Sequence, residues 1–203
     1  MSLNIVISGI GGQGSVMASR VLALAAMENG LSVRTSEVTG MAQREGMVTS
    51  HVRMGAGLYG AIIPDRQADF LLGLELSETV RALPKVKPAG CVIAATTTVI
   101  PAAVHLGLSE YNREALTEYL KAYAGDRLSF LDLDALVRRA GHPKTGNVVM
   151  LGALAAFPGL PFSREQLLAS LLKYVPEKLG TINMRAFEIG YRNMEGTQNG
   201  NLD

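Results

Sequence analysis

Six residues near the start of the chain constrain the fold more than any other feature. Gly9, Gly11 and Gly14 have the spacing G-x-G-x-x-G within the segment GIGGQG. This segment follows a β-branched run at residues 4–8 and precedes a run rich in Ala, Leu and Met at residues 15–29. Glycines adopt positive φ and let an anion approach the backbone, so such a turn between a strand and a helix is typical of phosphate-binding α/β folds. We therefore expect a buried strand, a tight loop and a helix.

The glycine loop has two interpretations. In one, the backbone N–H groups at the helix N-terminus bind a phosphate or a nucleotide-like ligand. Glu37 follows at about the distance where dinucleotide folds place their ribose-binding acid. In the other, the glycines only allow close packing of strand and helix. Nicotinamide chemistry is disfavoured because no separate substrate domain is left over. The candidate binding residues of the loop are Gly9, Gly11, Gly12, Gln13 and Gly14.

The rest of the chain predicts an α/β fold with a Rossmann-like, mostly parallel sheet, flanking helices and extra C-terminal helices. Residues 47–54 alternate in polarity, and a turn follows at residues 55–57. This pattern predicts a β-hairpin in which residues 58–63 pair back. Further strands are expected at residues 32–38 and 128–133, and further buried strands at residues 69–73 and 91–97.

The final third of the sequence is expected to be helical. Residues 147–157 are too apolar for a surface helix, and Ser163 with Gln166 forms a capping box. A last helix is predicted near residues 183–195. No linker is visible, so residues 1–195 are interpreted as one domain and residues 196–203 as a disordered tail.

Composition narrows the class of protein. The net charge of the 203-residue chain is +1, without the basic excess that nucleic-acid binding usually requires. No apolar run of about 18 residues is present, so a membrane span is not expected. The single cysteine, Cys91, cannot form an internal disulfide or hold an iron–sulfur cluster, and no metal site is predicted. The expected compartment is a reducing cytoplasm.

Polar residues gather in residues 37–53 of a mostly apolar chain. On a strand, Thr49, His51 and Arg53 would share one face. That face would meet an anion, a partner protein or solvent, in the last case with an ion pair such as Arg53 with Glu37. No second histidine or aspartate has triad spacing, so no residue is assigned a catalytic role. The substrate or interface candidates are Glu37, Gln43, Arg44, Ser50, His51 and Arg53.

Two long segments together carry a family resemblance. GIGGQGSVMASRVLALAAMENG and SEVTGMAQREGMVTSHVRMG resemble the gamma-type domain of 2-oxoacid:ferredoxin oxidoreductases, which is called the beta subunit in the indolepyruvate enzyme. The later segments ADFLLGLE and NVVMLGAL are also similar, and the resemblance covers most of residues 4–195. Glu45 departs from the pattern, where the family usually has glycine. The Met-Ala-Gln-Arg sequence within this segment favours indolepyruvate or another aryl 2-oxoacid as the substrate of the complex.

The resemblance implies one component of a complex that decarboxylates a 2-oxoacid oxidatively to an acyl-CoA and reduces ferredoxin. Thiamine diphosphate, magnesium and iron–sulfur clusters are then expected on partner subunits, and ferredoxin is an indirect partner. By matching positions, Gly11 to Gly14 would face phosphate, with coenzyme A a candidate ligand. Gln43, Arg44, Ser50, His51 and Arg53 would lie near the subunit interface or the substrate entrance.

Three alternatives stay open at this point. In the first, the chain is a subunit of such a complex and is inactive on its own. In the second, it is a free-standing nucleotide-binding oxidoreductase. In the third, it is a structural scaffold whose motifs serve subunit packing. A homodimer also stays open. Sequence does not fix the 2-oxoacid, because the resemblance implies that its pocket is shared with other chains.

Overall fold

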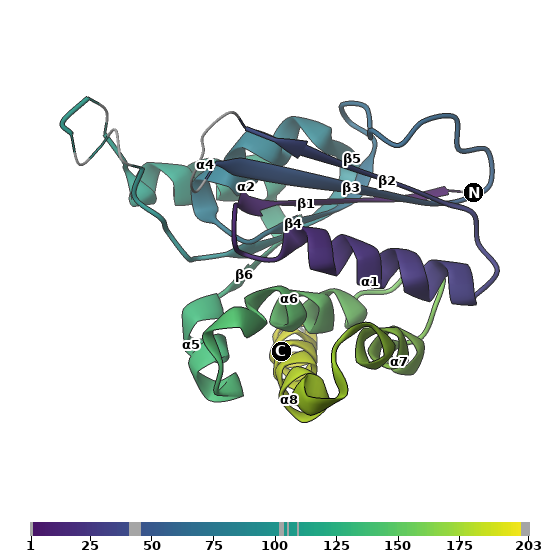
Figure 1. Ribbon diagram of the computed structural model, residues 1–203. Coiled ribbons are helices and arrows are strands. Elements are labelled where there is room, and N and C mark those ends of the chain that lie inside the picture. The colour runs from purple at the N-terminus through teal and green to yellow at the C-terminus, as the bar shows by residue number, and fades with distance from the viewer. Residues whose placement is uncertain (1, 41–45, 102–103, 105, 109, 200–203) are drawn as a thin grey trace.

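The computed structural model describes residues 2–40, 46–101, 104, 106–108 and 110–199. A six-stranded sheet forms the centre, and helices cover both of its faces (Figure 1). The strands are β1 (Ser2–Ile10), β2 (Val33–Thr39), β3 (Met47–Gly55), β4 (Ala68–Gly73), β5 (Val86–Ala95) and β6 (Leu128–Leu131). The α-helices are α1 (Ser15–Glu28), α2 (Leu76–Ala82), α4 (Arg113–Ala124), α5 (Leu133–Ala140), α6 (Gly146–Ala155), α7 (Arg164–Tyr174) and α8 (Gly180–Asn199).

The sheet has the strand order β2-β3-β1-β4-β5-β6. β3 runs antiparallel to β1 and to β2, whereas β1, β4, β5 and β6 pair in parallel. The α/β fold with a mostly parallel sheet is therefore confirmed. Apolar strand sequences such as the buried run Ile5–Ile7 fit this arrangement, because helices cover both faces of the sheet.

The predicted hairpin between β3 and residues 58–63 is wrong. Residues 58–63 contain no strand. Both edges of β3 are already occupied, by β1 on one side and β2 on the other, so no edge is free for them. The antiparallel partner that lies next to β3 in sequence is β2, and residues 40–46 connect the two strands.

Two apolar clusters pack against the two faces of the sheet. The larger contains Ile5, Ile7 and Met54 together with residues of α1, α5, α6, α7 and α8. The smaller contains Val6 and Leu71 together with residues of α2 and α4. The alternation of Ile5, Val6 and Ile7 between the clusters is the period-two pattern of a strand with both faces covered.

The predicted C-terminal helices are confirmed, and two of them cross closely. A Cβ on Gly152 of α6 would come closer than 3.0 Å to the backbone of Phe187, and one on Gly190 of α8 would do the same at Val149. Glycines thus let α6 and α8 approach backbone to backbone. The capping box of Ser163 and Gln166 at the start of α7 is also confirmed.

The prediction of a disordered tail is wrong at residues 196–199. Helix α8 continues to Asn199, so residues 196–199 are helical, and the rest of the predicted tail lies outside the described residues. Within the described part of the chain, no helix combines the length and the apolar character that crossing a membrane requires.

Candidate functional site

The chain changes direction across the sheet between β1 and β4. β1 leads into α1, which packs in the larger cluster, whereas β4 leads into α2, which packs in the smaller one on the opposite face. β1 and β4 are parallel neighbours, so their carboxyl ends meet at the same edge. In open α/β sheets, ligands bind in the crevice outside the strand ends at such a switch point. The glycine loop lies at this place.

Glycine is required at two positions of the loop for different reasons. Gly14 has φ +81°, and a Cβ there would come closer than 3.0 Å to the side-chain amide of Asn147. Gly12 has φ +93°, and a Cβ there would meet no atom within 4 Å. Glycine is therefore needed at position 14 both for the turn and for close packing against α6, whereas Gly12 faces open space.

Gln13 locks the loop onto the protein. Its Oε1 accepts a hydrogen bond from the N–H of Ile10 at 2.9 Å, and its Nε2 donates to the carbonyl oxygen of Leu74 at 3.1 Å. A Cβ on Gly9 would lie only 2.5 Å from that Oε1. The side chain of Gln13 is thus used within the fold rather than presented to a ligand. It joins the carboxyl ends of β1 and β4.

The loop still exposes backbone. Gly11 and Gly12 are exposed, and the N–H of Gly11 donates to the carbonyl of Gly46 at 2.9 Å. Within the described residues, the N–H of Gly12 has no acceptor. Helix α1 begins directly after the loop, without a side-chain cap and without an acidic residue in its first turn. Its positive dipole end therefore meets an exposed, uncapped turn.

A small crevice of about 170 Å³ opens beside the loop. Gly12 and Gln13 form one wall, and Lys144, Gly146 and Asn147 form another. Helix α6 starts at Gly146, again without a side-chain cap or an acidic residue in its first turn. The crevice is also lined by one carboxylate, that of Asp134, whose Oδ1 accepts a hydrogen bond from the Thr97 hydroxyl at 3.1 Å. The two helix N-termini and Lys144 favour a phosphate or carboxylate group beside it.

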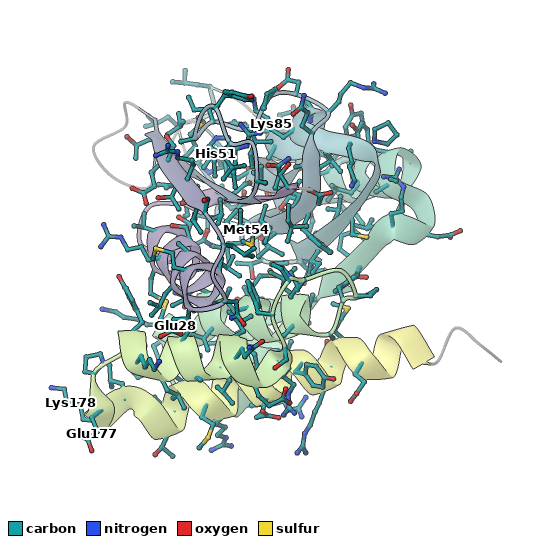
Figure 2. The ribbon with its side chains drawn as sticks, turned by 90° about the vertical axis from the view of Figure 1, so that its right-hand side faces the viewer. Glu28, His51, Met54, Lys85, Glu177 and Lys178 are labelled. Carbon is teal, nitrogen blue, oxygen red and sulfur yellow. The ribbon has the colours of Figure 1, made fainter. Side chains whose placement is uncertain are left out.

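The side chains of β3 divide between the two faces as predicted. Val52 and Met54 belong to the larger cluster on the α1 side. Ser50 shares their face; it is fully buried, and its Oγ has no hydrogen-bond partner in the described structure. His51 and Lys85 lie on the other side of the sheet from Met54 (Figure 2).

His51 is covered by its own chain. It is 2% exposed, and its Nδ1 accepts a hydrogen bond from the N–H of Ile63 at 3.3 Å. Burial lowers the pKa of His51, and nearby Lys85 lowers it further. The imidazole is therefore held neutral. It borders a hollow of about 240 Å³ that Glu78, Arg81 and Lys85 also line.

Arg53 is likewise bonded within the chain. Its Nε donates to Oδ1 of Asn4, and its Nη1 donates to the carbonyl oxygen of Gly60, both at 3.0 Å. The interpretation of this face as solvent-facing, with an ion pair between Arg53 and Glu37, is wrong. Residues 60–63 cover His51 and contact Arg53, whereas Glu37 is exposed on the edge strand opposite Ser50.

The inserted strand also separates Glu37 from the glycine loop. In a dinucleotide fold, the strand that carries the ribose-binding acid is a neighbour of the first strand. Here β3 lies between β1 and β2, which moves Glu37 away by a further strand spacing of about 4.8 Å. The other two interface candidates, Gln43 and Arg44, lie outside the described residues.

Sequence reasoning missed Glu75, a buried carboxylate next to the crevice. Glu75 is 1% exposed and caps α2 by accepting from the N–H of Glu78 at 2.9 Å. It also accepts from the hydroxyl groups of Ser77 and Tyr111, each at 2.7 Å, and from the N–H of Val99 at 3.2 Å. Burial and the hydrogen bond with Glu75 raise the pKa of Tyr111. The glutamate two residues after the buried strand ADFLLG was the available signal.

A second missed residue is Asn147, whose Nδ2 donates to the carbonyl of Gly14 at 3.1 Å. It is the polar first residue of an otherwise apolar segment, and that position was its signal. Among the residues that the structure describes, no three His, Cys, Asp or Glu side chains come together as a metal site. Cys91 is half-buried, and burial raises the pKa of its thiol.

The doubly wound sheet with a glycine-lined crevice at its switch point defines a Rossmann-like α/β protein. Residues 4–193 match the family model of pyruvate ferredoxin/flavodoxin oxidoreductases. The chain therefore belongs to the pyruvate ferredoxin/flavodoxin oxidoreductase family.

Individual proteins agree with this membership. The chain is 38% identical over 190 residues to indolepyruvate oxidoreductase subunit IorB of Thermococcus kodakarensis, covering 93% of this chain and 94% of that protein. It superimposes with a TM-score of 0.70 on the pyruvate oxidoreductase subunit PORC of Thermotoga maritima, at 21% identity, covering 94% and 96%. A 2-oxoglutarate:ferredoxin oxidoreductase from Magnetococcus marinus, solved with 2-oxoglutarate, coenzyme A and succinyl-CoA bound, gives a TM-score of 0.68 at 17% identity. This match covers 97% of this chain and 31% of that one.

Proposed function

We propose that this chain is the small subunit of a complex that oxidatively decarboxylates indolepyruvate or another aryl 2-oxoacid and reduces ferredoxin. The observation that carries the proposal is the 38% identity with an indolepyruvate oxidoreductase subunit along nearly the full length of both chains. The same likeness favours an aryl 2-oxoacid over pyruvate, because the likeness to the pyruvate enzyme subunit is only 21%.

The chain's own residues do not fit an iron–sulfur cluster. A cluster is usually held by four cysteine thiolates, and the sequence contains one cysteine. The sequence also contains no recognisable thiamine-diphosphate motif. We therefore assign thiamine diphosphate, magnesium and the clusters to partner subunits, which supply the decarboxylation and electron-transfer chemistry. Ferredoxin then meets the complex on a partner subunit rather than on this chain.

The crevice beside the glycine loop is the part of the chain that we assign to coenzyme A. Its exposed Gly12 backbone, the uncapped start of α1 and Lys144 suit a phosphate group of that molecule. The crevice volume of about 170 Å³ suits part of the ligand rather than all of it, so partner subunits would complete the site. Coenzyme A is bound in the solved structure of the Magnetococcus marinus enzyme, whose matching part has the same fold, and this supports the choice of ligand.

One observation favours a purely structural role instead. Gln13 is hydrogen-bonded to Ile10 and Leu74, and Asn147 donates to the carbonyl of Gly14, as residues of a packing motif would. In that alternative the loop joins β1, β4 and α6 and binds nothing. The two roles differ at Gly12, which makes no such contact.

Reconstitution tests the proposed function. The chain is purified alone and with the subunit that co-purifies with it, and each sample is assayed with indolepyruvate, phenylpyruvate, pyruvate or 2-oxoglutarate. Thiamine diphosphate, magnesium, coenzyme A and a dye acceptor are present throughout. We expect turnover only in the complex, fastest with the aryl substrates. Turnover by the chain alone would contradict the subunit assignment, and a preference for pyruvate would contradict the aryl assignment.

A further inference from the structure

Three arginines line one hollow on the far side of the helical layer. The hollow lies where α5 meets α8 and has a volume of about 520 Å³. Arg139 of α5 contributes from one side, and Arg185 and Arg192 of α8 contribute from the other. The remaining lining residues are Glu188, Ile189 and Asn193. The crevice beside the glycine loop uses other residues of α5, so the two hollows are separate.

The acidic residue in this hollow is already neutralised. Glu188 forms a close ion pair with Arg164 of α7 and a longer one, at 4.0 Å, with Arg192. The guanidinium of Arg164 also lies 4.5 Å from the centre of the Tyr191 ring, which fixes its position. Among the described residues, Arg139 and Arg185 have neither an ion-pair partner nor a side-chain hydrogen bond. The hollow therefore carries an uncompensated positive charge.

General basicity does not explain this cluster, because the net charge of the whole chain is only +1. Arg139 lies in the last turn of α5, where a cation favourably meets the negative end of the helix dipole. That argument does not extend to Arg185 and Arg192, which lie away from the C-terminal end of α8. Arg139, Arg185 and Arg192 are all exposed at the hollow, so their positive charges are accessible to an anion from solvent.

We propose that this hollow binds a ligand with two linked phosphate groups. Guanidinium groups present planar, bidentate donors that match phosphate oxygens, and they are less strongly hydrated than lysine ammonium groups. Three guanidinium groups on two packed helices offer more donors than one phosphate needs, which favours a diphosphate over a single phosphate. The concave shape and volume fit a small molecule, since ligand pockets commonly span about 300–1,000 Å³. The proposal is independent of the function proposed above.

Calorimetric titration of the full chain with inorganic pyrophosphate tests this site. We expect saturable binding that weakens with added salt and exceeds the binding of orthophosphate. Arg185→Gln should weaken pyrophosphate binding about tenfold, the loss expected for a charge-assisted hydrogen-bonded contact. Arg113→Gln is the matched control, because Arg113 is exposed on α4, which packs on the opposite face of the sheet from α5 and α8. It should bind pyrophosphate like the original chain, and thermal melting should show both variants folded.

Different outcomes would overturn the proposal. Absence of saturable pyrophosphate binding, or equal loss in Arg185→Gln and Arg113→Gln, would leave the arginines as a solvated helix face. Tight binding of a poly-glutamate peptide without pyrophosphate binding would identify an acidic-protein surface and contradict the small-molecule site. The same titrations are repeated with ADP and with coenzyme A. If Arg185→Gln weakens their binding as well, the diphosphate is recognised as part of a nucleotide.

Discussion

The glycine loop after β1 and the polar face of β3 lie on neighbouring strands, yet they use their polar groups differently. At the loop, side chains turn inward: Gln13 bonds to Ile10 and Leu74, and the Gly12 backbone remains exposed. On β3 the chain covers the polar side chains themselves, since His51 is bonded to Ile63 and Arg53 to Gly60. The loop keeps exposed backbone groups that a ligand could bind, whereas the polar side chains of β3 form hydrogen bonds within the fold.

The difference teaches that a side chain's chemical type does not tell whether it serves a site. His51 and Arg53 are residue types that catalysis and anion binding favour, but burial lowers the pKa of His51 and two acceptors hold Arg53. Gly12 has no side chain at all, yet it lines the crevice, and its N–H has no acceptor among the described residues. The expected consequences of substitution therefore differ between the two regions.

The largest expected effect separates packing from ligand binding within the loop itself. Gly14→Ala would combine positive φ with overlap against Asn147. We expect it to lower the free energy of unfolding by about 1–3 kcal/mol for overpacking, with about 1 kcal/mol more for the left-handed backbone. Urea unfolding of the isolated chain measures this loss.

Gly12→Ala is the matched control for that experiment. It has the same kind of backbone conformation but meets no atom within 4 Å, so only the backbone loss of about 1 kcal/mol is expected. Equal losses in the two variants would mean that Asn147 does not constrain the loop.

Much of the first region could be predicted from the sequence, because its signals are local. A β-branched run, glycines at fixed spacing and a helix-forming run each determine the backbone near them. The role of Asn147 could not be predicted, since its contact with Gly14 joins residues far apart in the chain. The same holds for Glu75, whose partners include Val99 and Tyr111.

The second region was predicted only in part. Alternation correctly placed Ser50, Val52 and Met54 on one face of β3 and His51 and Arg53 on the other. The alternation of side chains along a strand does not tell which strands lie beside β3 or which segments cover its faces. The insertion of β3 between β1 and β2, and the cover that residues 60–63 provide, depend on tertiary packing.

The next effect concerns the β3 face. Arg53→Lys keeps the charge but cannot reach Asn4 and Gly60 with the same planar geometry. We expect the isolated chain to lose about 1–3 kcal/mol of unfolding free energy, the range for hydrogen bonds of charged groups. Arg34→Lys is the control, because Arg34 pairs with Arg53 in register but is exposed on the edge strand.

Arg34→Lys should change stability by less than about 0.5 kcal/mol, as surface substitutions usually do. If the melting temperature of Arg53→Lys is also unchanged, the side chain of Arg53 is not needed for the chain's own fold. Arg53 would then again be a candidate for contact with a partner subunit. Thermal melting of both variants alongside the original chain supplies this comparison.

The smallest expected effect is a pH dependence due to His51. Burial lowers its pKa in the folded state, with a further contribution from Lys85, while Glu78 and Arg81 line the same hollow. As pH falls below the ordinary histidine value of about 6.5, the unfolded state binds the proton first, so stability declines until the folded-state pKa is passed. Burial raises the pKa of Glu78, which acts with the opposite sign at lower pH.

His51→Gln should remove the decline between about pH 6.5 and 5, because its amide does not titrate in that range. Melting curves of the original chain and the variant across that range provide the measurement. If the melting temperature falls equally with pH in the original chain and in the variant, other groups cause the pH dependence.

The most direct test of the account compares Gly12→Asp with Gly12→Asn in the reconstituted complex. The two side chains have nearly the same shape, both tolerate positive φ better than most residues, and only aspartate adds negative charge at the crevice. The measurement is coenzyme A affinity by titration, with melting of each isolated variant as a check on folding. We predict that Gly12→Asp weakens coenzyme A binding at least about tenfold more than Gly12→Asn, as repulsion between the carboxylate and a bound phosphate requires. Equal affinity in the two variants would contradict an anion site at the glycine loop and leave the loop as a packing motif.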